Sequence, residues 1–339
     1  MKQSKTMNVL IYGAGAIGSH IAYCMHSAGH TVYLLARGQH FAQMKKKGLH
    51  IKLYDNQQLK DERVLTESPR FFILSSLEQI EAKVLDYIFI TVKLSSYVPE
   101  VIKDLQPYMA PDTAVIPPCT KLPFWFFYNL SGNLNSKYNN LDFDADLSQY
   151  FCRENIIGMT MWLSAVIEGP GKVALRHTQR GYPLKEIHPK MKGRADKLRE
   201  VFELTCMSPV TEDIRSEMFI KSINAFAFNI VALDTGFSNE QLNHDKSSKE
   251  RIRQIMLEGD KILEVLSLPI IQDIESRIIQ TLSSSKHTMS MLHDYNNGKN
   301  IELPYIWSGF ESISDILGIN MEFSKALFHK VMDKCGVDR

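Results

Sequence analysis

The sequence predicts an α/β fold, in which a doubly wound parallel sheet is followed by an all-α domain. Three observations lead to this prediction. Apolar segments of the length of buried strands alternate with helical patterns between residues 8 and 116. A glycine-rich turn joins the first of these segments to the first helix. From residue 214 onward, apolar side chains recur with helical spacing nearly to the end of the chain.

The length and composition favour two domains. The chain has 339 residues, of which 44% are apolar, and this is enough to bury two ordinary cores. A break at Ser208-Pro209 follows a predicted helix at 194–204, and the pattern is helical after it. We therefore expect one domain at 1–212 and a second at 213–339.

The first domain begins with a strand, a helix and a second strand. Residues 8–12 are mostly apolar and suit a buried parallel strand, and residues 31–36 form a second such segment. Gly29 ends the helix between them. The helical spacing is carried by Ile17, Ile21, Ala22 and Met25. The three elements make a βαβ unit of about 30 residues.

The sheet continues after this unit. Residues 84–92 and 114–116 are predicted as buried strands, and residues 97–105 as a helix between them. Residues 117–150 form a long insertion near the sheet edge. Its aromatic cluster at 124–128 is expected to pack against the sheet.

The rest of the chain completes the sheet and then becomes helical. Residues 156–163 and 172–176 are predicted as strands around a Gly-Pro-Gly turn, and they suggest a small extension of the same sheet. The second domain has a long apolar helical segment at 219–233 and amphipathic stretches at 250–266 and 305–317. This pattern predicts an all-α domain.

The charge balance and the cysteines limit the partners. Lysine and arginine number 39 and aspartate and glutamate 38, a net charge of +1, so nucleic acid is not expected as a partner. No apolar run reaches the roughly 18 to 20 residues that cross a bilayer, so a membrane is not expected either. The scattered cysteines lack a CxxC pattern, which favours a cytoplasmic protein with reduced thiols and no metal site. They are Cys24, Cys119, Cys152, Cys206 and Cys335.

The glycine-rich turn predicts dinucleotide binding. In YGAGAIGS, Gly13 permits the tight turn, Gly15 lets backbone N–H groups approach a pyrophosphate, and Gly18 lets the helix pack on the strand. The motif alone is weak, but here it lies between a buried strand and an amphipathic helix. We therefore predict a Rossmann-type domain. The cofactor-binding residues of the turn are predicted as Gly13, Ala14, Gly15, Ala16, Ile17 and Gly18.

Two cations follow the strands of this domain. Arg37 stands where folds that prefer NAD place an acid, and its guanidinium suits a 2′-phosphate, so the sequence favours NADP. The alternative is a solvated surface arginine. Lys93 follows the strand at 84–92 and is predicted to reach a phosphate or ribose of the cofactor, although an exposed loop lysine fits the pattern nearly as well.

The combined motifs resemble the ketopantoate reductase (2-dehydropantoate 2-reductase) family. They are GAGAIGS, ARG, TVK, IRSEMFIKSINAFAFN and SMLHDYNNGKNIE, in that order over most of the chain. The resemblance implies a helical domain after the Rossmann domain and an active site in the cleft between them. It also implies NADPH-dependent reduction of ketopantoate to pantoate, on the route to coenzyme A.

The resemblance implies roles for four residues. Lys221 matches the catalytic lysine, which donates a proton to the carbonyl oxygen as hydride arrives from the nicotinamide. Asn229 and Ser290 match residues that bind substrate, and Glu302 would accept from a substrate hydroxyl or orient Lys221. Without the resemblance, Lys221 would be interpreted as a snorkelling residue at a helix end and Asn229 as a buried core amide. Ser290 would be an ordinary helix residue and Glu302 a solvated surface acid.

Two positions depart from the family pattern. The second substrate asparagine falls on Ala225, and Asn224 is an uncertain stand-in because it lies about 100° away around the helix. Thr120 takes the place of the family's asparagine after the strand at 114–116, and it offers one donor rather than two. These departures put the identity of the substrate in doubt more than the type of reaction.

The sequence therefore predicts an NADPH-dependent reductase of a small 2-oxo acid, with ketopantoate as the leading substrate. One alternative is a different small 2-oxo acid. Another, from a different class, is a non-catalytic NADP-binding sensor or scaffold. The sequence does not determine the oligomeric state, and a homodimer is compatible with it.

Overall fold

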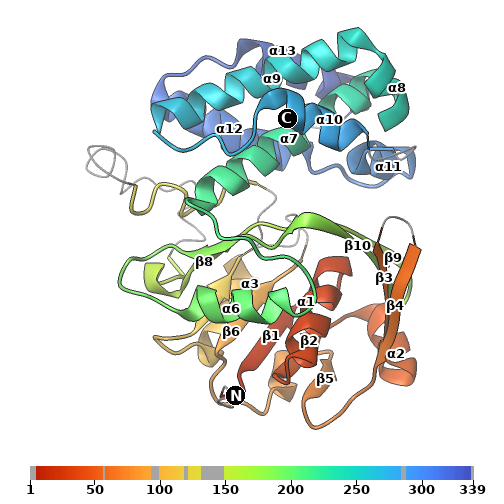
Figure 1. The fold of residues 1–339 in the computed structure, drawn as a ribbon, viewed down its shortest axis with the longest axis vertical. Coiled ribbons are helices and arrows are strands. Elements are labelled where there is room, and N and C mark those ends of the chain that lie inside the picture. Colours follow the sequence, from red (N-terminus) through yellow and green to blue (C-terminus); the bar gives the residue numbers. More distant parts are fainter. Residues whose placement is uncertain are drawn as a thin grey trace. The chain divides into compact units, whose positions relative to one another are not determined.

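The structure is a computed structural model that describes residues 5–55, 58–92, 99–117, 121–130, 149–283 and 288–336. The chain divides into two compact units. Unit 1 comprises Met1–Cys119 and Phe127–Ile214, and unit 2 comprises Thr120–Phe126 and Arg215–Arg339 (Figure 1). Each unit is described separately below.

Unit 1 is built on a five-stranded parallel sheet with the strand order β5-β2-β1-β6-β7. The chain starts at the middle strand, moves to one edge, and crosses back to the other edge, as in a doubly wound fold. This confirms the predicted fold class. The strands are β1 (Asn8–Tyr12), β2 (Thr31–Leu35), β5 (Phe71–Leu74), β6 (Tyr87–Ile90) and β7 (Ala114–Ile116).

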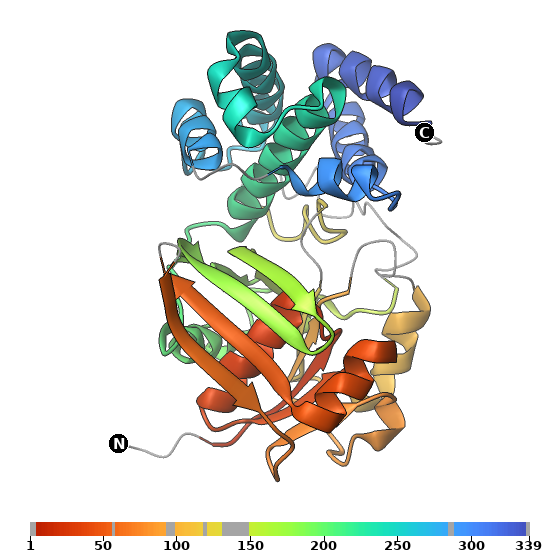
Figure 2. The same cartoon turned by 90° about the vertical axis from the view of Figure 1, so that its right-hand side faces the viewer.

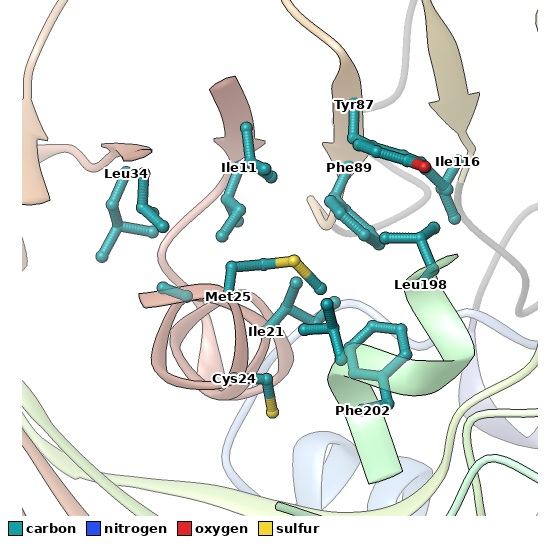
Figure 3. Packing of buried hydrophobic residues seen from close by; sticks show 14 of the residues in the cluster. Ile11, Ile21, Cys24, Met25, Leu34, Tyr87, Phe89, Ile116, Leu198 and Phe202 are labelled. Carbon is teal, nitrogen blue, oxygen red and sulfur yellow. The ribbon is translucent and has the colours of Figure 1, made fainter. Parts of the chain in front are cut away.

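Two helices pack on one face of this sheet. Ile21 and Met25 project from one side of α1 (Ala16–Ser27), as the helical spacing of the sequence predicts. Phe202 of α6 (Arg194–Glu203) belongs to the same buried cluster, together with Phe89 of the sheet (Figure 3). Within the described residues, the unit also contains α2 (Gly38–Lys47), α3 (Pro99–Leu105) and the short 3-10 turns η1 (Leu77–Gln79), η3 (Gln106–Tyr108) and η4 (Arg153–Asn155).

A second sheet of four strands lies over α1, in the order β4-β3-β10-β9 (Figure 2). Its strands β3 and β10 are parallel, and the other neighbours are antiparallel. The strands predicted at 156–163 and 172–176 were expected to extend the main sheet. This is wrong for 172–176, because β10 pairs with β3 and β9 instead. From the segment 156–163, Ile156 forms an isolated bridge to Val115 of β7. The strands are β3 (Leu49–Asp55), β4 (Gln58–Leu65), β9 (Trp162–Gly169) and β10 (Lys172–Gly181), and a separate pair is formed by β8 (Ile157–Met159) and β11 (Leu184–Glu186).

Unit 2 is helical in its described residues and is organised around α7 (Ile214–Thr235). This helix is apolar on most sides, and Phe219, Ile223 and Phe226 are fully buried. Gly259 of α9 lies against it, since a Cβ atom there would come within 2.6 Å of Cγ1 of Ile223. The helices around α7 are α8 (Asn239–His244), α9 (Lys246–Val265), α10 (Ile274–Leu282), α11 (Ser290–Asn296), α12 (Leu303–Leu317) and α13 (Glu322–Cys335). None of the helices in the described ranges is long and apolar enough to cross a lipid bilayer.

The start of the aromatic insertion belongs to unit 2. The backbone carbonyl of Phe126 accepts a hydrogen bond from Nε of Arg215 at 2.8 Å, and its ring lies 6.2 Å from that of Phe219. Leu122 packs on Gly309 of α12. The prediction that the aromatic cluster at 124–128 packs against the sheet is therefore wrong for residues 124–126, which are buried and belong to the helical unit instead.

Candidate functional site

The turn between β1 and α1 has the shape of a pyrophosphate cradle. Gly13 has φ +118°, a conformation that favours glycine, and a Cβ atom on Gly18 would lie 2.0 Å from the carbonyl oxygen of Gly13. Gly15 differs, because a Cβ atom there would meet only the carbonyl oxygen of Thr91, at 3.9 Å. The backbone at Gly15 is therefore open to close approach by a ligand.

The helix that follows this turn offers an uncompensated N-terminus. Gly15 is the N-cap of α1 and provides no side chain, and the first turn contains no acidic residue. The first N–H groups of a helix lack intrahelical acceptors, and the helix dipole favours a negative charge beside them. A dinucleotide pyrophosphate fits this arrangement.

Arg37 follows β2 and forms the N-cap of α2. Its Nη2 donates a hydrogen bond to the hydroxyl of Tyr12 at 2.9 Å, and its Cζ lies 5.9 Å from the centre of the Tyr12 ring. Tyr12 is the last residue of β1 and is 5% exposed, so it is a rigid support. Arg37 is an exposed residue, so its guanidinium can bind an anion.

Tyr12 was not among the predicted site residues. Its position one residue before the glycine motif was visible in the sequence, but its contact with Arg37 depends on the parallel pairing of β1 with β2. Thr91 has a comparable role, because its hydroxyl donates to the carbonyl of Gly13 at 2.6 Å and braces the turn. Lys93 and Thr120, both predicted as site residues, lie outside the described residues.

Lys221 lies in the second turn of α7 and is half-buried. Ala225 and Asn229 follow at intervals of four residues, so the three lie along one side of the helix. Asn224 is 8% exposed, and its Oδ1 is buried without a hydrogen-bond partner among the described residues. Helix α7 thus presents a lysine, a small residue and two amides around the same two turns.

Asn229 connects α7 to the start of α11. Its Oδ1 accepts a hydrogen bond from the backbone N–H of Met291 at 3.0 Å, and its Nδ2 donates to the carbonyl of Ala225 at 2.8 Å. Ser290 is the first residue of α11 and is exposed, immediately before the bonded Met291. The structure therefore brings the predicted residues Asn229 and Ser290 together.

Glu302 is the N-cap of α12 and is half-buried. Its backbone carbonyl accepts from the N–H of Ile306 at 3.2 Å. The described contacts do not join its carboxylate to Lys221. Among the described residues, no group of three or more histidine, cysteine, aspartate or glutamate side chains could hold a metal ion.

Comparison with known families gives two matches along the chain. Residues 9–118 match the family model described as "Ketopantoate reductase PanE/ApbA". Residues 213–333 match the model described as "Ketopantoate reductase PanE/ApbA C terminal". Together the two matches cover more than half of the chain.

Two proteins named 2-dehydropantoate 2-reductase are similar to nearly the whole chain. The one from Mesorhizobium japonicum is 25% identical over 315 residues, which are 92% of this chain and 92% of the relative. The one from Archaeoglobus fulgidus is 23% identical over 329 residues, 96% of this chain and 97% of the relative.

Solved structures share the fold. A 2-dehydropantoate 2-reductase from Geobacter metallireducens superimposes with a TM-score of 0.76 at 19% identity, covering 97% of this chain and 99% of its own. A D-mandelate dehydrogenase, solved with NADH and anilino(oxo)acetate, gives a TM-score of 0.73 at 21% identity, with 98% and 100% covered. At this identity the likeness shows the fold alone.

Proposed function

The chain belongs to the ketopantoate reductase PanE/ApbA family of oxidoreductases, and on this premise we propose that it reduces ketopantoate to pantoate with NADPH. The observation that carries the proposal is the presence in one chain of an open backbone at Gly15, a supported guanidinium at Arg37 and a half-buried Lys221. The relatives named 2-dehydropantoate 2-reductase support the same substrate.

Unit 1 supplies the cofactor site in this proposal. The residues of the turn, Gly13, Ala14, Gly15, Ala16, Ile17 and Gly18, hold the pyrophosphate against the N-terminus of α1. Arg37 binds the 2′-phosphate that distinguishes NADPH from NADH, and Lys93 contacts a phosphate or the ribose. When bound, NADPH supplies the hydride that reduces the carbonyl carbon.

Lys221 acts as the general acid. Its ammonium group donates a proton to the carbonyl oxygen of the substrate, and before that transfer it stabilises the negative charge that develops on this oxygen. The half-burial of Lys221 strengthens this interaction, because fewer water molecules compete for the charge. A general acid typically contributes about 10² to 10⁴ in rate.

The substrate is held by residues around Lys221. Ser290 donates from its hydroxyl to the substrate carboxylate, and Asn229 positions Ser290 through its bond to Met291. Glu302 accepts from a substrate hydroxyl or orients Lys221. The Oδ1 of Asn224, which has no hydrogen-bond partner among the described residues, is a further acceptor near the amide that Ala225 lacks. Thr120 is proposed to contact the substrate as well.

The test is steady-state oxidation of NADPH by purified protein with a panel of 2-oxo acids. We expect the highest kcat/KM for ketopantoate, compared with pyruvate and phenylglyoxylate. Equal kcat/KM values across the panel would remove the specific assignment and leave only the reaction type.

A second candidate is the reduction of another 2-oxo acid, with a more apolar side chain. It is favoured by Ala225, which replaces an amide by a methyl group beside Lys221. A higher kcat/KM for phenylglyoxylate than for ketopantoate would establish it. Binding of NADPH without turnover of any acid would instead indicate a non-catalytic sensor or scaffold.

The location and partners belong to the same proposal. We propose that the protein works in the cytoplasm on a small 2-oxo acid. Four cysteines lie within the described residues, and none of them forms a disulfide with another described residue. They are Cys24, Cys152, Cys206 and Cys335. A homodimer stays a prediction, which light scattering tests.

A further inference from the structure

The segment that follows β6 packs against the glycine turn between β1 and α1. A Cβ atom on Gly13 would lie 3.0 Å from Cγ1 of Val92 and 3.1 Å from the carbonyl carbon of Thr91. A Cβ atom on Gly18 would lie 2.5 Å from Oγ1 of Thr91. The hydroxyl of Thr91 therefore lies in space that only a glycine at position 18 leaves open.

Two hydroxyl groups hold successive carbonyls of the turn. Thr91 donates from Oγ1 to the carbonyl of Gly13 at 2.6 Å. Ser19 is fully buried in α1, and its Oγ donates to the carbonyl of Ala14 at 3.2 Å. The backbone of Thr91 is held in turn, because its N–H donates to the carbonyl of Tyr12 at 3.0 Å. One carbonyl is thus fixed from the sheet and the next from the helix.

These two bonds determine the direction of two backbone N–H groups. In a planar trans peptide, the carbonyl and the N–H of the next residue point in opposite directions. The bond to Thr91 therefore turns the N–H of Ala14 away from Thr91. In the same way, the bond to Ser19 turns the N–H of Gly15 away from the body of α1. Neither N–H donates to a backbone carbonyl in the described part of the chain, so both are available to an anion at the N-terminus of the helix.

We propose that the hydroxyls of Thr91 and Ser19 hold the glycine turn in the conformation whose N–H groups bind the pyrophosphate of the dinucleotide. Both act through the backbone of the turn, so they are positioning residues. The inference rests on the proposed cofactor site and adds two residues to it. Because NADPH and NADH share the pyrophosphate, loss of either hydroxyl weakens the binding of both by a similar factor. Arg37 differs, since it acts on the 2′-phosphate of NADPH alone.

Substitutions at Thr91 separate its hydroxyl from the packing of its side chain. Thr91→Val removes the hydroxyl and nearly keeps the volume, whereas Thr91→Ser keeps the hydroxyl and removes a methyl group. Thr113→Val is the matched control, because Thr113 belongs to the same unit and its Oγ1 donates to the carbonyl of Leu85 at 2.6 Å. The dissociation constants of NADPH and NADH are measured by fluorescence titration, together with the midpoint of thermal unfolding.

We expect Thr91→Val to raise both dissociation constants about five- to ten-fold. Thr91→Ser is expected to stay within about two-fold of the wild type. Thr113→Val should lower the unfolding midpoint and leave both dissociation constants unchanged. The nucleotide 2′-AMP carries the 2′-phosphate but no pyrophosphate, so isothermal titration should give Thr91→Val and the wild type the same affinity for it. A purely structural role would weaken the binding of 2′-AMP as well.

Ser19→Ala is an independent test, because it acts on the next peptide and from the helix. We expect it to raise the dissociation constants of NADPH and NADH about three-fold, less than Thr91→Val does, since the bond of Ser19 is longer. Ser208→Ala is its control. Ser208 is a buried serine of unit 1, and its Oγ donates at 2.6 Å to the carbonyl of Tyr182, outside the turn.

Wild-type affinity of Thr91→Val for both dinucleotides would overturn the inference, and so would a loss confined to NADPH. An equal loss in Thr91→Ser would overturn it by assigning the effect to the methyl group, and an equal loss for 2′-AMP by assigning it to the fold. If Thr91→Val folds poorly, Ser19→Ala decides, and its wild-type affinity for both cofactors would refute the proposal. Failure of the wild-type protein to bind either dinucleotide would instead reject the proposed function, and this inference with it.

Discussion

At the residue scale, cofactor preference depends on the guanidinium of Arg37 and on its support by Tyr12. A charge-assisted hydrogen bond contributes about 1.5 to 3 kcal/mol. We therefore expect Arg37→Ala to weaken NADPH binding about 10- to 100-fold and to leave NADH binding nearly unchanged. Fluorescence titration with both cofactors measures the effect.

Arg63 provides a matched control for this prediction. It is an exposed arginine of β4, paired with Asp61, and Arg63→Ala should leave both affinities unchanged. Tyr12→Phe should give a smaller loss for NADPH than Arg37→Ala, because the ring remains while the hydroxyl is removed. Equal losses of NADPH and NADH binding in Arg37→Ala would mean that Arg37 is structural.

The proposed general acid leads to a second prediction at this scale. Lys221→Ala should lower kcat by at least about 100-fold, because the proton donor is lost from the transition state. NADPH binding should be retained. Stopped-flow turnover and cofactor titration on the same preparation measure the two effects. Lys261→Ala, which changes an exposed lysine of α9, is the control, and unchanged turnover in Lys221→Ala would reject the mechanism.

The sequence predicted some residue contacts and could not predict others. The glycine turn was predictable because Gly13, Gly15 and Gly18 act within one local segment. The bond from Asn229 to the N–H of Met291 was not, because it joins two helices that are far apart in the chain. The hydrogen bond from Arg37 to Tyr12 could not be predicted either, because these residues are 25 positions apart in the chain.

At the element scale, the close crossing of α7 and α9 depends on Gly259. A Cβ atom at Gly259 would lie 2.6 Å from Cγ1 of the fully buried Ile223, so either the Ile223 side chain or one of the two helices must move. Overpacking of a core typically costs about 1 to 3 kcal/mol. We expect Gly259→Ala to lower the free energy of unfolding of unit 2 by this amount, measured by urea denaturation.

The double variant Gly259→Ala, Ile223→Ala tests the cause of this loss. The substitution at 223 removes both Cγ1 and Cδ1, so the double variant should lose less stability than the sum of the two single losses if the clash is responsible. Gly169→Ala is the control, because a Cβ atom there meets nothing within 4 Å. A Gly259→Ala protein as stable as the wild type would show that the helices adjust without cost.

Elements were predictable where their own pattern was strong. The strands β1 and β7 begin and end where the sequence predicts, because short apolar segments with clear ends lie there. The strands β3 and β4 were not predicted. In β4 the signal is weak, because this strand is exposed, rich in charged residues and lacks a buried face. The pairing of β10 with β3 was also missed, because sheet pairing between distant segments leaves no local signal.

At the scale of the whole molecule, the order of elements predicted the doubly wound sheet and the helical domain. It did not predict that residues 122–126 join the helical core. An aromatic cluster can pack into any apolar core. Which core it joins depends on partners such as Arg215 and Phe219, which come much later in the chain. Composition alone cannot identify those partners.

The stability of unit 1 should depend on pH through its histidines. Burial lowers the pKa of His26, His30 and His40 below the ordinary value of 6.5. The unfolded chain therefore binds more protons than the folded chain as the pH falls through 6.5. The stability that these residues contribute is present above this pH, and it is lost as the pH falls through their folded pKa values.

Hydrogen exchange of peptides from the main sheet, measured at pH 7.5 and at about pH 5.5 and corrected for intrinsic rates, tests this prediction. Each excess proton bound by the unfolded state costs about 1.4 kcal/mol per pH unit, so protection should fall at the lower pH. His30→Gln should reduce the fall, since His30 is 4% exposed. His244→Gln, at an exposed histidine of α8, should not. Equal protection of the main sheet at both pH values would contradict the prediction, because the three histidines would then become charged at no cost to the stability of unit 1.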